Sequence, residues 1–150
     1  MSNLSSMSYG EFGRLRFLDF FPRASAYEED DIGGIDYGTG YAGKEGYTST
    51  LFARQRNETS AVLLEFGDDC PEREGHALLA SLGLSVRKGM TYEQVLASLG
   101  VPERDRRKFV RFVVGDKWPY YVGCSIDDSN ALFRVWMARK DLVDRNEEAL

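Results

Sequence analysis

Residues 87–102 read RKGMTYEQVLASLGVP, and they encode both ends of a short helix. Thr91 is a natural N-cap, because its hydroxyl can accept a hydrogen bond from a free amide of the first turn, and Gln94 can reach back to complete a capping box. Apolar side chains then recur at helical spacing: Tyr92, Val95, Leu96 and Leu99. Gly100 can adopt the left-handed conformation that ends a helix, and Pro102 prevents its continuation. The segment predicts a short helix between Thr91 and Gly100.

A second helix is predicted just before this one. Residues 67–71 read GDDCP, a turn that ends in a proline suited to the first turn of a helix. Three leucines mark its inner face: Leu78, Leu79 and Leu82. Gly83 ends it, and the sequence Ala-Ser-Leu-Gly closes both helices, 17 positions apart. The two similar helix ends indicate one αα-hairpin, about residues 71–100.

The rest of the chain predicts mainly β-structure. Apolar alternation and β-favouring residues predict strands over 14–21, 48–55, 60–66, 109–114, 120–126 and 131–138, with a short terminal helix or tail over 139–150. In the fifth strand Tyr120, Val122, Cys124 and Ile126 are expected on one face, and Tyr121, Gly123 and Ser125 on the other; in the sixth, Leu132, Arg134 and Trp136 are expected opposite Phe133, Val135 and Met137. The nearly continuous apolar run of 60–66 predicts a central strand. We predict an α+β fold, an antiparallel β-sheet with the αα-hairpin (about 71–100) packed on one face.

Length and composition predict one folded domain. The chain has 150 residues, of which 43% are hydrophobic and 29% charged, so residues 1–150 are expected to form a single α+β domain that frays at 1–10 and 145–150. No apolar run approaches the ~20 residues of a membrane span, and residues 1–7 do not resemble an export signal. A cytoplasmic protein is expected, with Cys70 and Cys124 as free thiols.

The charge is uneven along the chain. The formal net charge is −5, and residues 1–50 carry four basic and eight acidic side chains. An acidic front half argues against nucleic acid as the main partner, because phosphate binding needs a basic field, and it is compatible with a basic protein partner. The charged run 103–108 mixes acids with bases and is interpreted as a solvated connector.

Two motifs before residue 50 are interpreted as loops. Glu28-Glu29-Asp30-Asp31 is expected to be a solvated turn, because a calcium site would need alternate spacing and a later Glu. Gly38-Thr39-Gly40-Tyr41-Ala42-Gly43 formally matches G-x-G-x-x-G, but the residues that follow make a poor helix. A glycine-rich hairpin loop is the favoured interpretation of that motif.

The single histidine offers one candidate for chemistry. His76 lies near several acidic residues: Asp68, Asp69, Glu72 and Glu74. A small hydrolase or a metal- or ligand-binding enzyme could use this group, but without a second histidine the ligand set is thin, and acids in a first helical turn already complement the helix dipole. No metal and no cofactor are expected.

A binding function is favoured over an enzymatic one, because no catalytic triad, metal cluster or credible phosphate loop is visible. Aromatic residues carry much of the energy of protein interfaces. The candidate partner-binding residues are Trp118, Tyr120, Tyr121 and Trp136, rimmed by Asp116, Asp127 and Asp128. The competing interpretation is that these aromatic side chains belong to the core. The sharpest form of the binding hypothesis is an intracellular inhibitor or immunity-type protein.

A family resemblance points the same way. The run Val86-Arg87-Lys88-Gly89-Met90-Thr91, then Val95, then Leu99-Gly100-Val101-Pro102, resembles the helix-turn signature of the SmpA/OmlA (BamE-like) and β-lactamase-inhibitor-like group. The resemblance covers residues 86–102 and implies a helix pair packed on an antiparallel sheet whose strands follow the second helix. It also implies a non-catalytic scaffold or inhibitor that grips another protein. It carries no binding residue.

Overall fold

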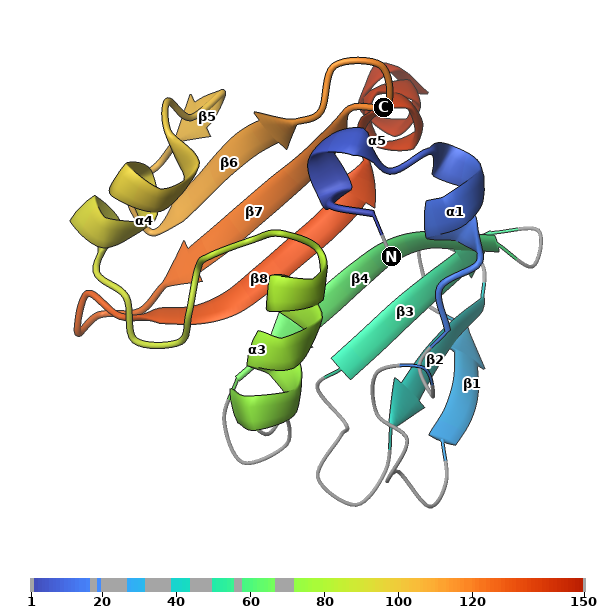
Figure 1. The fold of residues 1–150 in the computed structure, drawn as a ribbon, viewed down its shortest axis with the longest axis horizontal. Helices are drawn as coiled ribbons and strands as arrows, with labels where there is room; N and C mark the ends of the chain where they lie inside the picture. Colours follow the sequence, from blue (N-terminus) through green and yellow to red (C-terminus); the bar gives the residue numbers. More distant parts are fainter. Residues whose placement is uncertain are drawn as a thin grey trace.

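The computed structural model describes residues 2–16, 19, 27–31, 39–43, 50–55, 58–66 and 72–149. An eight-stranded antiparallel sheet runs through the molecule in the order β1-β2-β3-β4-β8-β7-β6-β5 (Figure 1). The strands are β1 (Tyr27–Asp31), β2 (Thr39–Gly43), β3 (Thr50–Gln55), β4 (Glu58–Glu65), β5 (Arg104–Asp105), β6 (Phe109–Val114), β7 (Tyr120–Ile126) and β8 (Leu132–Arg139). The predicted α+β class with an antiparallel sheet is confirmed, and β4 lies in the middle of the sheet as predicted.

Helices cover one face of this sheet. They are η1 (Leu4–Ser6), α1 (Tyr9–Gly13), α3 (Glu72–Ser81) and α4 (Tyr92–Leu99), while α5 (Lys140–Ala149) packs on the opposite face. Figure 1 shows α1 and α3 in front of the strands, and α4 beside β5 and β6. The main core lies between them and the sheet, where Leu78 and Val95 meet alternate residues of β4, β6, β7 and β8. Cys124 is a free thiol in this core, and burial raises its pKa to about 12.

The helix ends follow the sequence. The Thr91 hydroxyl accepts a hydrogen bond from the Gln94 amide at 3.2 Å, and the Gln94 side chain accepts one from the Thr91 amide at 2.9 Å, so the capping box is complete. Gly83 and Gly100, just past the ends of α3 and α4, have φ values of +76° and +92°. Residues other than glycine rarely adopt a positive φ, so a glycine at such a position favours the end of a helix. Both helices end beside the glycine that predicts their end.

The predicted fraying of residues 1–10 is wrong. Leu4 and Met7 are completely buried in the main core, and the Leu4 amide donates to the Leu82 carbonyl at 2.8 Å. The Tyr120 hydroxyl donates to the Met7 carbonyl at 2.8 Å. The N-terminal segment therefore covers the main core above β7. In the sequence, the only sign of this burial is a few isolated apolar residues in a polar stretch. The C-terminal end, also expected to fray, continues as helix α5 to Ala149.

Three other predictions before residue 50 are wrong. Residues 14–16 form no strand, because the chain leaves α1 in a turn that Arg14 closes onto Glu11; the rest of the predicted strand, apart from Asp19, lies outside the described residues. The acidic run 28–31 is not a turn but part of strand β1, which lies at the edge of the sheet. Thr39–Gly43 is not a loop but strand β2, paired on both sides. Residues 32–38 lie outside the described residues.

A β-bulge corrects the faces predicted for β8. Ser125 pairs with Arg134, but Ile126 pairs with Leu132, so Phe133 is the extra residue on β8. The alternation shifts there by one position, and Leu132 joins Val135 and Met137 in the main core. The faces predicted for β7 are correct.

Candidate protein-interaction surface

The sheet face opposite α3 and α4, called the open face below, carries several partly exposed residues of the central strands. Its members alternate with the core residues and are Leu63 and Glu65 on β4, Arg134 and Trp136 on β8, Tyr121, Gly123 and Ser125 on β7, and Phe109, Arg111 and Val113 on β6. Of the helices described, only α5 packs on this face, through Val143. The part of the face away from α5 has no helical cover among the described residues.

Two aromatic rings lie against Gly123 at the centre of the open face. A Cβ atom at Gly123 would stand 2.7 Å from Phe109 Cζ and 3.1 Å from Trp136 Cε3, so the rings approach this backbone from two strands. Trp136 is also the cross-strand partner of Leu63. Phe109, Trp136 and Leu63 are each half-buried. Because Gly123 has no side chain, the rings of Phe109 and Trp136 can both lie over β7. Together with Leu63 they form one apolar band across β6, β7, β8 and β4.

The end of the open face beneath α5 is closed by a network of polar contacts. The Arg111 guanidinium lies 3.9 Å from the centre of the Tyr121 ring and donates to Glu103 at 2.8 and 3.2 Å. The Tyr121 hydroxyl donates to Asp144 of α5 at 2.6 Å. Burial, and then this hydrogen bond, raise the pKa of Tyr121, whereas the hydrogen bonds from Arg111 lower the pKa of Glu103. Arg111 and Tyr121 are buried and hold α5 in place.

The opposite end of the open face is bordered by an ion pair. Arg134 Nη2 lies 3.0 Å from Glu65 Oε1, and both side chains are 40% exposed. The Arg134 guanidinium also stands 5.1 Å from the centre of the Phe133 ring. The apolar band therefore lies between two polar regions, one covered by α5 and one open to solvent, which is the arrangement of an interface core with a polar rim.

The predicted aromatic patch does not form one surface. Tyr120 is completely buried on the helix-covered face and Tyr121 is 3% exposed on the other, so neither can supply exposed contact area. Trp118 is half-buried against Tyr9 on the helix-covered side, with ring centres 5.3 Å apart. Trp136 alone of the four lies in the apolar band. The four aromatic residues lie on or next to the neighbouring strands β7 and β8. Adjacent residues of a strand point to opposite faces of the sheet, so these side chains are divided between the two faces.

The three acidic residues predicted to rim the patch lie in hairpin turns. Asp127 accepts hydrogen bonds from the amides of Ser129 at 2.8 Å and Ala131 at 3.1 Å, so it shapes the β7–β8 turn. Asp128 pairs with Lys108, which lowers the pKa of Asp128. Asp116 is exposed in the β6–β7 turn. Two of the three carboxylates thus already have partners within the chain.

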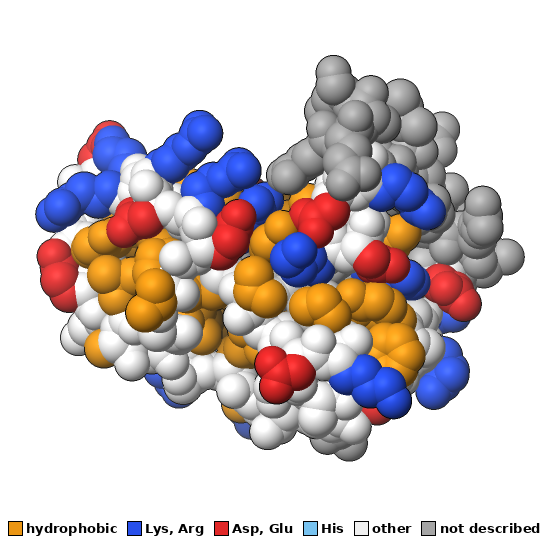
Figure 2. All heavy atoms as spheres, turned by 90° about the horizontal axis from the view of Figure 1, so that it is seen from above, with side chains coloured by type: hydrophobic (Ala, Val, Ile, Leu, Met, Phe, Trp, Pro, Cys, Tyr) orange, Lys and Arg blue, Asp and Glu red, His pale blue; other side chains and the backbone are white. Residues whose placement is uncertain are grey.

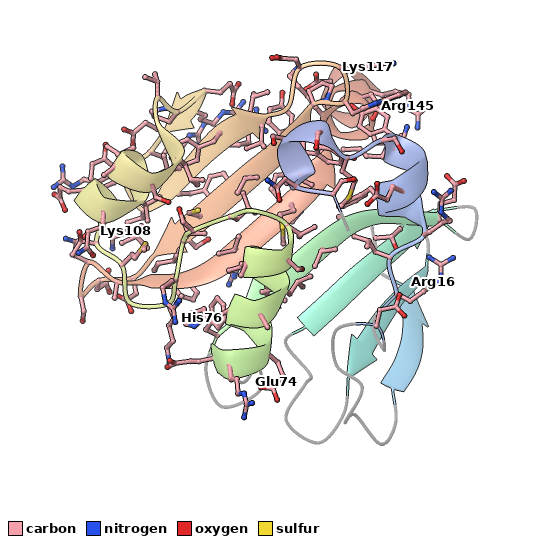
Figure 3. All side chains as sticks on the ribbon, viewed as in Figure 1. Arg16, Glu74, His76, Lys108, Lys117 and Arg145 are labelled. Atoms are coloured by element: carbon pink, nitrogen blue, oxygen red, sulfur yellow. The ribbon has the colours of Figure 1, made fainter. Side chains whose placement is uncertain are left out.

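His76 ties α3 to the segment that leads to α4. Its Nε2 accepts a hydrogen bond from the Lys88 amide at 2.9 Å, and Glu72 pairs with the Lys88 ammonium at 3.2 Å. Burial, and then the nearby Arg87, lower the pKa of His76. Figure 3 shows His76 and Glu74 on different sides of α3. Asp68 and Asp69 lie outside the described residues, and no contact in the described part of the chain favours an acid–base role for His76.

Sequence reasoning missed two members of the apolar band, Leu63 and Phe109, and also Gly123, against which the two rings lie. Each lies at an alternate position of a predicted strand, but the sequence does not say which strands are neighbours. Gly123 in the middle of a strand was the available signal, because such a glycine often marks a close approach by another group.

Searches for a metal site, a membrane span and known relatives give no positive result. Within the described ranges, no group of three or more His, Cys, Asp or Glu side chains could hold a metal ion. None of the described helices combines the length and apolar character that crossing a membrane requires. A scan against protein-family models, a search of curated proteins and a search of solved structures each gave no match.

Proposed function

We propose that this chain is a non-enzymatic protein-binding module whose contact surface is the open face. The observation that carries the proposal is the apolar band of Leu63, Trp136 and Phe109, which stays half-exposed on strands whose alternate residues are fully buried. Large aromatic side chains that lie together on a rigid surface are typical anchors of protein interfaces. Both rings pack closely against the backbone of Gly123, so little side-chain entropy would be lost on binding.

An inhibitor or immunity-type protein is the sharpest form of this proposal. Such proteins act by occupying a surface of their target, which requires shape and anchoring residues rather than reactive groups. The resemblance of residues 86–102 to the SmpA/OmlA and β-lactamase-inhibitor-like group supports a sheet that binds another protein and carries a helix pair on one face. The identity of the target does not follow from these residues.

The two tryptophans provide a matched test of the contact surface. Both are half-buried, but Trp136 lies in the apolar band whereas Trp118 packs beside Tyr9 on the helix-covered side. We expect the tagged chain, purified from the organism that encodes it, to retain a stoichiometric protein partner. Trp136→Ala should lose this partner, and Trp118→Ala should keep it at a comparable loss of thermal stability. Loss of the partner in both variants, or in neither, would contradict a role for the open face.

A further inference from the structure

One corner of the molecule carries a dense group of cations. This basic corner is formed by β5 and the turn into β6 and consists of Arg104, Arg106, Arg107 and Lys108, all exposed. In Figure 2 a group of Lys and Arg side chains lies beside hydrophobic ones at the end of the molecule that carries α4 and β5. Figure 3 places Lys108 at the same end. The chain as a whole has a net charge of −5, so this basic region stands out against an acidic protein.

The acidic residues between these cations, Glu103 and Asp105, are exposed but accept hydrogen bonds from other residues of the chain. Glu103 accepts both hydrogen bonds from buried Arg111. Asp105 accepts hydrogen bonds from the Tyr92 hydroxyl and from the Arg107 amide, the latter at 2.8 Å. No ion pair joins Arg104 or Arg106 to any residue that the structure describes. Arg104 and Arg106 therefore make no direct ion pair within the described part of the chain, whereas Lys108 pairs with Asp128 of the β7–β8 turn.

Hydrogen bonds between backbone groups define the turn in the basic corner. The Arg106 amide donates to the Phe109 carbonyl at 3.0 Å, and the Lys108 amide donates to the Arg106 carbonyl at 2.7 Å. Arg107 has a φ of +62°, a conformation that side chains with a Cβ rarely adopt, and its guanidinium stands 5.1 Å from the centre of the Tyr92 ring. A tight turn that holds an arginine in this region presents the cations at defined positions, which reduces the entropy lost on binding.

Three features connect the basic corner to a possible partner chain. Arg104 is the cross-strand partner of Arg111, so it lies on the same side of the sheet as Phe109 in the apolar band. Among the described strands β5 lies at the edge of the sheet and pairs with β6, and an edge can accept main-chain hydrogen bonds from an added strand. Val101, directly before this corner, is 92% exposed. Cations, a free edge and an exposed aliphatic side chain suit an extended protein segment with acidic and apolar residues.

We infer that the partner bound at the open face presents an acidic, extended segment to the basic corner. This inference rests on the proposed protein-binding function and reverses the charge of partner expected from the overall composition. A protein segment is favoured over a nucleic acid, because a long polyphosphate would meet the net negative charge of the rest of the chain. A short acidic segment would contact the corner alone.

Fluorescence anisotropy with labelled probes tests the inference on the full chain. The probes are a fluorescein-labelled peptide of alternating glutamate and valine, its lysine–valine counterpart, and a single-stranded oligonucleotide. The corner variant is Arg104→Glu with Arg106→Glu. The matched control is Arg73→Glu with Arg145→Glu, which makes the same change in charge at exposed sites on α3 and α5. Circular dichroism verifies that all proteins are folded.

We expect the acidic peptide to bind the wild type and the control with similar affinity, and to bind the corner variant about tenfold or more weakly. The affinity should fall as salt is added, and the lysine–valine peptide should not bind. Failure of the acidic peptide to bind, equal weakening in both variants, or tighter binding of the oligonucleotide would overturn the inference. These peptide measurements do not depend on the open face. The proposed function is tested separately, by the retention of a protein partner in Trp136→Ala and Trp118→Ala.

Discussion

The two faces of the sheet differ although the same strands build both. On the helix-covered face Val62, Phe112 and Tyr120 are no more than 1% exposed, whereas on the open face Leu63 and Phe109 are half-buried and Val113 is 42% exposed. The residues alternate along each strand, so the difference arises from what covers each face. One face of these strands supplies stability, and the other supplies a surface that a partner could cover.

The largest expected effect contrasts a buried leucine with a half-buried one. Leu4→Ala should lower the free energy of unfolding by about 2–5 kcal/mol, because Leu4 is completely buried beneath the helices. Leu63→Ala removes the same atoms from the open face and should cost less, about 1–2 kcal/mol, because part of the Leu63 side chain is already in contact with water. Urea unfolding of both variants measures the contrast. Equal losses would mean that the open face is as well covered as the other.

A smaller effect tests the packing of the aromatic rings at Gly123. Gly123→Val should destabilise the protein by about 1–3 kcal/mol, because the new side chain would collide with Phe109 and Trp136. Adding Phe109→Ala makes room and should recover part of that loss. A double-mutant cycle by urea unfolding gives the coupling between the two positions. Strictly additive effects would show that the Phe109 ring does not lie over Gly123.

The smallest effect concerns pH and the helix-covered side. The folded-state pKa of His76 lies below its ordinary value of 6.5, chiefly because of burial, so the unfolded chain binds the proton more readily. The contribution of His76 is therefore complete above about pH 6.5 and is lost as the pH falls through the folded-state pKa. Urea midpoints at falling pH should decrease more for the wild type than for His76→Gln, which cannot titrate. A smaller decrease in the wild type would contradict this assignment.

Local signals predicted the ends of α3 and α4 and the two faces of β7 correctly. The capping box at Thr91 and the stop at Gly100 depend on residues within a few positions of each other, so the sequence contains them. The two faces of β7 follow from simple alternation. Burial of the N-terminal segment was missed because Leu4 and Met7 carry no periodic pattern and find their partners at residues far along the chain.

The candidate surface was harder to predict than the fold, because it depends on which strands are neighbours. Trp136 was identified from its residue type alone, and its three sequence-predicted aromatic companions lie elsewhere. Phe109 and Gly123 meet only because β6 and β7 pair in one register. The bulge that moves Leu132 into the core leaves no mark in the local pattern. The orientation of Glu103 and Asp105 toward partners inside the protein is equally invisible in a run of mixed charges.

Site-specific photo-crosslinking tests the central claim most directly. A benzophenone amino acid is placed at one of two exposed positions: Val113 on the open face, or Ala80 on α3 on the other side of the sheet. Each variant is then irradiated in the organism that encodes the chain. The account predicts one discrete protein adduct from position 113 that is absent from position 80. No adduct at position 113, or the same adducts from both positions, would contradict the claim that the open face is the binding surface.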